Sequence, residues 1–215
     1  MTLKFSSPML AVVLAATLCT TLGGCVPLVL GGAAMSVMVA ADRRTSGTQL
    51  DDEGIELRGA SRLRDTFGDR AHINITSYNR QVLLTGEVPS DAAKQQAEQV
   101  VAGLENVRSI VNELVAAPVT SMVQRSNDTL ITGKMKASLV DDKQLYAGAF
   151  KVVTERGTIF LMGRVTAPEA DRATAIARQI DGAQRVVRIF DVISDEEMRR
   201  IQTQLAPTSP SSSRP

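Results

Sequence analysis

The chain contains the same pattern twice, and this duplication limits its possible folds more than any single residue does. Each copy has a short apolar stretch, a turn, and a second apolar stretch in which a glycine stands two residues before a valine. The copies occupy residues 73–88 and 151–165, and their glycines, Gly86 and Gly163, lie 77 residues apart. A solenoid needs at least about three repeats to be stable. Two copies therefore predict a pair of small tandem domains.

The first copy predicts the element order α-β-β-α-β. Asp51 or Asp52 is expected to cap a helix that ends near Thr66, and two strands with alternating apolar residues follow. Ser90 is expected to cap a second helix, and Val107–Val115 has the composition of a third strand.

The second copy predicts the same order. Asn127 or Asp128 is expected to cap a helix over Thr129–Val140, and a hairpin follows. The next helix is expected to start after Thr166, and Gln184–Ile193 to form the closing strand. We therefore predict the α+β class, with two domains at residues 51–116 and 127–193, each a three-stranded mixed sheet packed on two helices.

Several residues in the two copies are interpreted as structural. A glycine inside a strand usually marks a bulge or a close backbone approach, and this is our interpretation of Gly86 and Gly163. His72 is the only histidine and has no second ligand beside it. Phe160 and Met162 point away from the helix-covered sheet face, which predicts a contact with the other domain or with a partner.

The sequence offers no constellation that is typical of an enzyme or a metal site. It has one histidine, two cysteines and no G-x-S-x-G motif. The acidic pairs Asp51–Asp52 and Asp141–Asp142 stand at predicted helix ends, where capping and the helix dipole account for them. We therefore expect no catalysis, no cofactor and no metal.

Charge is distributed unevenly between the copies. The whole chain has a formal net charge of +1, which argues against a nucleic-acid binder. Residues 51–115 hold 7 Lys and Arg against 11 Asp and Glu, whereas residues 128–193 hold 10 against 8. If one copy meets an anionic surface, the second is the better candidate.

The first 24 residues predict a secretory signal peptide, with Lys4 before an apolar run from Met9 to Leu18. The next residue, Cys25, ends the sequence Leu-Gly-Gly-Cys, which resembles the lipobox of bacterial lipoproteins. In that family the cysteine is lipidated, so we expect fatty acids such as palmitate on Cys25 and a tether over residues 25–50. The alternative is an uncleaved apolar anchor, although the apolar piece after Cys25 is shorter than the roughly 20 residues that span a bilayer.

The C-terminal segment, residues 194–215, changes character along its length. It begins with charged residues compatible with a short helix and ends in a stretch rich in Pro and Ser. Because this last stretch has too little apolar content to fold, we expect the tail to be largely disordered.

The duplicated unit resembles the BON domain in its element order and in residues 82–88 and 159–165. The second copy also has the family's Asp181–Gly182 turn before the last strand, where the first copy has Glu105–Asn106. Together with the lipobox, the chain is similar to the dual BON-domain outer-membrane lipoproteins of Gram-negative bacteria. This resemblance implies a protein anchored to the outer membrane, facing the periplasm, that binds anionic phospholipid such as phosphatidylglycerol and supports envelope integrity.

The resemblance also implies which residues touch lipid. The contact falls on the first helix of the second domain, at Leu130, Gly133, Lys134 and Ala137. An outward Leu130 one turn from Lys134 also fits a helix that lies in a membrane interface, while the simpler interpretation is that Leu130 only fastens the helix end. The alternative function is a periplasmic protein-protein adaptor that regulates an envelope partner through the Phe160 and Met162 face or the acidic first domain.

Overall fold

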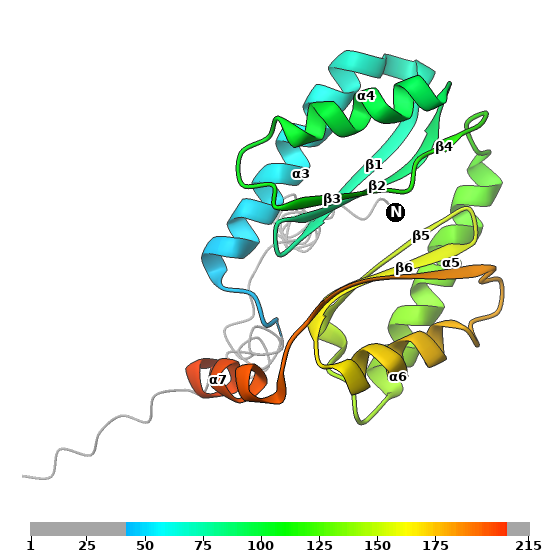
Figure 1. Ribbon diagram of the computed structural model, residues 1–215. Coiled ribbons are helices and arrows are strands. Elements are labelled where there is room, and N and C mark those ends of the chain that lie inside the picture. Colours follow the sequence, from blue (N-terminus) through cyan, green and yellow to red (C-terminus); the bar gives the residue numbers. More distant parts are fainter. Residues whose placement is uncertain (1–41, 206–215) are drawn as a thin grey trace, which may run out of the picture. The chain divides into compact units, whose positions relative to one another are not determined.

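The computed structural model describes residues 42–205 (Figure 1). The expected signal peptide, Cys25, most of the expected tether and the tail after Leu205 lie outside these residues. All the elements below belong to one compact unit of the chain. None of the helices within residues 42–205 is long and apolar enough to cross a membrane.

The first domain has the predicted element order. Its β2 pairs antiparallel with β1 and parallel with β3 and β4, so the sheet is mixed. The expected third strand is broken into two short pieces, β3 and β4. The elements are α3 (Ser46–Phe67), the 3₁₀ turn η2 (Gly68–Arg70), β1 (His72–Tyr78), β2 (Gln81–Val88), α4 (Asp91–Ala102), β3 (Ser109–Asn112) and β4 (Val115–Ala116).

The second domain repeats this order, with β6 antiparallel to β5 and parallel to β7. A last helix, α7, follows it and buries Met198 and Ile201 against Ile193. The α+β fold with two tandem domains is thus confirmed. The elements are α5 (Met122–Asp141), η3 (Ala147–Ala149), β5 (Phe150–Glu155), β6 (Thr158–Val165), α6 (Ala167–Ala177), β7 (Arg185–Val192) and α7 (Asp195–Leu205).

The first helix of each domain begins earlier than the sequence analysis expected. Thr45 caps α3 with its side-chain oxygen, so residues 46–50 belong to a helix and not to the tether. Ser121 caps α5 in a capping box with Gln124, two turns before the expected start. The expectation that Asp51 or Asp52, and Asn127 or Asp128, cap these helices is therefore wrong.

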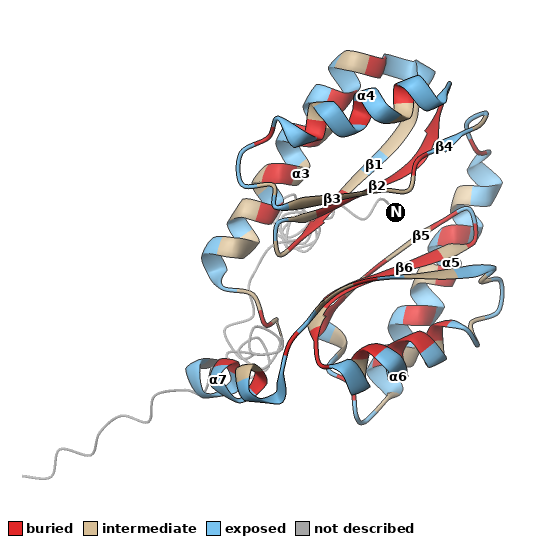
Figure 2. Ribbon diagram, in the orientation of Figure 1, coloured by how far each residue is buried: buried red, intermediate tan, exposed pale blue. Residues whose placement is uncertain are grey.

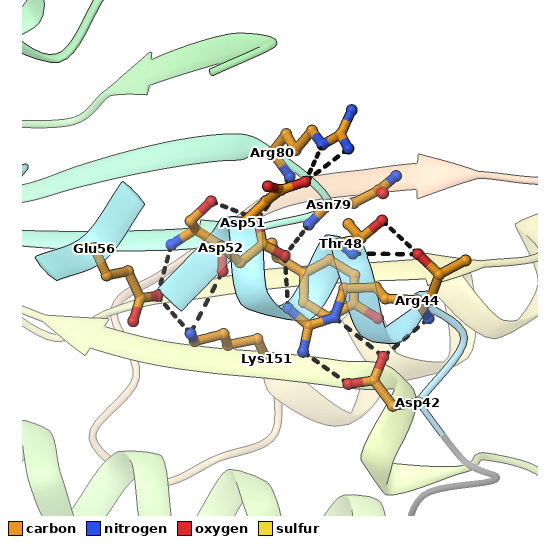
Figure 3. Close-up of polar contacts among 12 residues, drawn as sticks. Asp42, Arg44, Thr48, Asp51, Asp52, Glu56, Asn79, Arg80 and Lys151 are labelled. Atoms are coloured by element: carbon orange, nitrogen blue, oxygen red, sulfur yellow. Dashed lines mark hydrogen bonds and ion pairs between the residues drawn. The ribbon is translucent and has the colours of Figure 1, made fainter. Parts of the chain in front are cut away.

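Asp52 and Asp128 instead hold the hairpin turns of their domains. The Asp52 carboxylate accepts the backbone N–H groups of Asn79 and Arg80 at 2.8 and 2.7 Å (Figure 3). Asp128 does the same at the second hairpin, with the N–H groups of residues 156 and 157 at 2.9 and 2.8 Å.

Both turns are of the tight two-residue kind whose central residues have positive φ. Asn79 and Arg80 have φ of 53° and 62°, and Arg156 and Gly157 have 51° and 70°. In this conformation the turn N–H groups are left outside the sheet ladder, and one buried aspartate satisfies both of them.

Each domain has its own hydrophobic core between its sheet and its two helices (Figure 2). In the first domain Val82, Leu84 and Val88 of β2 meet Ile55 and Val101 of the helices. Because strand residues alternate between faces, the odd-numbered residues of β2 point to the other side of the sheet.

A third cluster joins the two domains across these other faces. Leu83 and Tyr78 from the first sheet pack with Phe160, Met162 and Ile189 from the second. The Tyr78 hydroxyl donates to the Ala149 carbonyl at 3.3 Å, and burial raises the pKa of Tyr78 to about 12. Of the two contacts expected for Phe160 and Met162, the structure therefore shows the one with the other domain.

The segment before α3 also connects the domains. Arg43 is buried and makes a bidentate ion pair with Glu169 at 2.8 and 2.6 Å, and donates to the Arg164 carbonyl at 3.0 Å. Its neighbour Arg44 lies over the Tyr78 ring and reaches Asp52. Residues 42–45, which we expected to belong to a free tether, are fixed on the folded domains.

We expect the substitution Asp128→Asn to destabilise the protein. An amide offers one acceptor oxygen where two N–H groups now meet a carboxylate, so the loss should be about 1.5–3 kcal/mol in the free energy of unfolding. Asp141→Asn, at an exposed position at the end of the same helix, should change it by less than about 0.5 kcal/mol. Urea denaturation of residues 38–215 measures both, and equal effects would contradict the role given to Asp128.

Candidate functional site

The four residues predicted to touch lipid lie together on the outward side of α5. Leu130 is 63% exposed, and Gly133, Lys134 and Ala137 are exposed as well. They follow each other at i, i+3, i+4 and i+7, which places them on one helix face. The opposite face packs into the core through Ile131, Met135 and Leu139. We call the four residues the α5 outer face.

The helix extends this face in both directions with further exposed apolar residues. Val123 lies two turns before Leu130, and Val140 lies one turn beyond Ala137; both are exposed, as is Met122. The sequence analysis missed Met122 and Val123 because it started the helix at Thr129. The Ser121–Gln124 capping box was the signal that predicts the true start.

A cavity of about 560 Å³ opens beside the α5 outer face. Its walls come from α5, from the β5–β6 turn and from the turn between α6 and β7. Leu130 and Lys134 of the predicted site line this cavity, whereas Gly133 and Ala137 do not. The Lys134 ammonium group donates to the Asp181 carbonyl at 3.4 Å. We call this cavity the α5 pocket.

A second polar cluster lies at one end of the contact between the sheets. Glu87 is fully buried and accepts hydrogen bonds from the backbone and hydroxyl of Thr120 at 3.2 and 3.3 Å. His72 Nδ1 lies 3.2 Å from Glu87, and Arg156 reaches the other oxygen at 3.3 Å. Glu155 lies close by and accepts from Asn74 at 2.8 Å.

This cluster brings together the atoms that a metal ion would need. Ligand atoms of His72, Glu87 and Glu155 lie within 4.8 Å of one another. However, the arginine and hydroxyl contacts occupy both Glu87 oxygens, and the Arg156 guanidinium already balances its charge. The arrangement is that of a buried ion-pair network between the domains, in which His72 has a structural contact.

The two strand glycines lie where neighbouring backbone comes too close for a side chain. At Gly86, φ is +112° and a Cβ atom would lie 2.0 Å from the His72 carbonyl oxygen. At Gly163 the corresponding distance to the Ala149 carbonyl oxygen is 2.6 Å. Neither glycine lines the α5 pocket.

Comparison with known proteins gives consistent matches along the chain. The family model of the BON domain matches residues 51–118 and 127–193. The chain is 38% identical over 183 residues to Outer membrane lipoprotein DolP of Haemophilus influenzae, covering 84% of this chain and 94% of that protein. It is 36% identical over 154 residues to the 21 kDa hemolysin of Actinobacillus pleuropneumoniae, covering 71% and 79%. It is 31% identical over 144 residues to Osmotically-inducible protein Y of Escherichia coli, covering 65% and 72%.

Glu155, which is buried, and Glu169, which is partly buried, are expected to respond oppositely when their charge is removed by substitution. Burial raises the pKa of Glu155, and the Asn74 hydrogen bond offsets this only in part. The folded state therefore holds the Glu155 proton more tightly than the unfolded state, and stability from this group is lost as the pH rises through the raised pKa. Glu155→Gln should thus raise the melting temperature at pH 7, with a gain that shrinks in acid.

Glu169 provides the matched control with the opposite sign. Burial alone would raise its pKa, but hydrogen bonds from Arg43 and Thr166 more than offset this and lower the pKa. The ionised Glu169 carboxylate therefore contributes to stability at any pH above the usual pKa of a glutamate, and this contribution is lost as the pH falls through the lowered pKa. Glu169→Gln should cost about 2 kcal/mol at pH 7. Thermal melts from pH 3 to pH 8 test both, and the same sign for the two variants would contradict this account.

Proposed function

The chain belongs to the BON domain family, with two BON domains in tandem, and we propose that it is a non-enzymatic, lipid-anchored protein of the periplasm that binds anionic phospholipid through the α5 outer face. In this proposal Cys25 carries the acyl anchor and the protein is attached to the outer membrane. It would there support the integrity of the cell envelope.

The observation that carries the lipid contact is the exposed apolar stripe of α5. Val123, Leu130, Ala137 and Val140 face away from the core along one helix, with Lys134 beside them. A helix of this kind lies in the membrane interface with its apolar side chains among the lipids. A lysine near an anionic bilayer surface adds about 1 kcal/mol.

A modest affinity is enough for such a contact when the protein is tethered. An acyl anchor on Cys25 would hold the domains at a high effective concentration near the bilayer. The envelope location is supported by the relative that is named an outer membrane lipoprotein and is covered over 94% of its length.

The non-enzymatic role is supported by what the buried polar groups do. Within residues 42–205, the histidine and the buried glutamates of the interdomain cluster are engaged with Arg156, Thr120 and Asn74. Asp52 and Asp128 hold the hairpin turns, so these acids have structural partners.

Of the two surfaces that we expected to serve the adaptor function, only the first domain is left exposed. Phe160 and Met162 are buried between the domains and do not offer a face to a partner. The first domain does expose Leu50 and Leu57 on α3, the latter 75% exposed. An envelope protein that binds these leucines is the second candidate.

We expect Leu130→Glu to weaken vesicle binding strongly. The change removes an apolar contact and places a carboxylate at the anionic surface, so affinity for phosphatidylglycerol vesicles should fall at least tenfold, about 1.4 kcal/mol or more. Wild-type binding should also weaken as salt is raised. Flotation of residues 38–215 with vesicles measures both effects.

Leu57→Glu is the matched control, because Leu57 is an exposed leucine on the first helix of the other domain. It should leave vesicle binding within about twofold. Equal binding by wild type and Leu130→Glu would refute the α5 contact. Loss of one crosslinked envelope partner in Leu57→Glu cells, without vesicle binding by the wild type, would favour the adaptor.

A further inference from the structure

The α5 pocket exists because the two domains differ at two turns. The hairpin turn places Gly157 where the first domain has Arg80, since each is the second central residue of its turn. The next turn places Gly182 where the first domain has Asn106, as the sheet registers Gln81↔Ser109 and Thr158↔Arg185 show. Both pairs have positive φ.

In the first domain these positions are filled by side chains tied to one aspartate. Arg80 donates to Asp51 at 3.0 and 2.7 Å (Figure 3). Asn106 donates to the same aspartate at 3.0 Å. The second domain has Asn127 in place of Asp51, because Asp52 and Asp128 hold the equivalent turns. Two glycines and a neutral amide thus replace an arginine, an asparagine and a carboxylate, and the space stays open.

The open space has a definite chemical character. The side-chain amides of Gln124, Asn127 and Gln184 line it together with the Lys134 ammonium group, Arg156 and Asp181. Gln124 Oε1 accepts the Ser121 N–H in the capping box, and Arg156 is paired with Glu87. The carboxylate of Asp128 is not free, because each of its oxygens accepts a turn N–H. Amides exchange hydrogen bonds with hydroxyl groups without the cost of burying a charge.

The mouth of the pocket lies at the apolar edge of the proposed membrane contact. Leu130 belongs both to the α5 outer face and to the pocket wall. Lys134 is one helical turn from Leu130 and lines the same wall, so an apolar and a cationic side chain stand side by side at the pocket.

We propose that the α5 pocket binds the headgroup of a single phospholipid, with the phosphate at Lys134 and a hydroxylated, uncharged headgroup among the three amides. This inference rests on the proposed function and adds to it a preference for one headgroup chemistry. A helix that binds the membrane only through the negative charge of its surface would not distinguish between anionic lipids of equal charge.

The test compares vesicles that carry the same charge on different headgroups. Residues 38–215 are floated with vesicles of phosphatidylcholine containing equal fractions of either phosphatidylglycerol or phosphatidylserine. The wild type should prefer the glycerol headgroup by about tenfold. Lys134→Gln should lose this preference, whereas Lys136→Gln should keep it, because Lys136 is an exposed lysine of the same helix that does not line the pocket.

A second variant fills the pocket with the side chains of the first domain. The triple substitution Asn127→Asp, Gly157→Arg and Gly182→Asn should abolish the preference while leaving charge-dependent vesicle binding. Arg80 and Asn106 already adopt positive φ at these positions. If the triple variant does not fold, the exposed Lys134→Gln and Lys136→Gln pair still decides the question.

The remaining outcomes separate this inference from the proposed function. Equal binding to both headgroups by the wild type, with equal effects of the two lysine substitutions, overturns the pocket and leaves the α5 contact standing. No binding to either vesicle refutes the proposed function and the pocket with it. Soluble glycerol phosphate and inorganic phosphate are added as competitors of vesicle binding. If either displaces the protein from the vesicles as effectively as added lipid does, the pocket binds a free phosphate compound and not a lipid headgroup.

Discussion

The contact between the two sheets is the constraint on which the rest of this structure depends. A small sheet that helices cover on one side leaves its other side to water, and both sheets here place apolar residues on that other side. Leu83 from one sheet packs against Phe160 and Met162 from the other in one buried cluster. Burial of a large apolar side chain stabilises the folded state by about 1.5–3 kcal/mol. The two small domains, each with a thin core of its own, therefore gain stability from a third core that they share. The helices are thereby turned outward, and this leaves the outer face of α5 free.

The repeat shows how one structural device can be kept while the surface beside it changes. In both domains a buried aspartate on the first helix accepts the two N–H groups of the hairpin turn. This contact fixes the turn against the helix regardless of the turn's side chains. The turn residue is then free to differ: Arg80 closes the surface of the first domain through Asp51, and Gly157 leaves the second open. The same fold therefore supports a closed surface in one domain and a pocket in the other.

The fold was accessible from the sequence because its information is local. Alternating strands, capped helices and the repeat of Gly86 at Gly163 predict the α+β class and the order of elements. The choice of Leu130, Gly133, Lys134 and Ala137 came from the resemblance to the BON family, and the structure exposes all four on one helix face. The roles of Asp52 and Asp128 were not accessible, because a carboxylate near a helix start fits a cap equally well. The pocket was also hidden, since its walls join α5 to turns that lie 20 or more residues further along the chain.

The segment before α3 fixes the two domains to each other in addition to the contact between the sheets. The Arg43 guanidinium group is bound to Glu169 at the start of α6 and to the Arg164 carbonyl, while Arg44 reaches Asp52 of the first domain. The sheets pack face to face, which places the helix layers of the two domains on opposite sides of the paired sheets. The proposed membrane contact therefore belongs to the helix layer of the second domain, on the side of its sheet that does not meet the first domain.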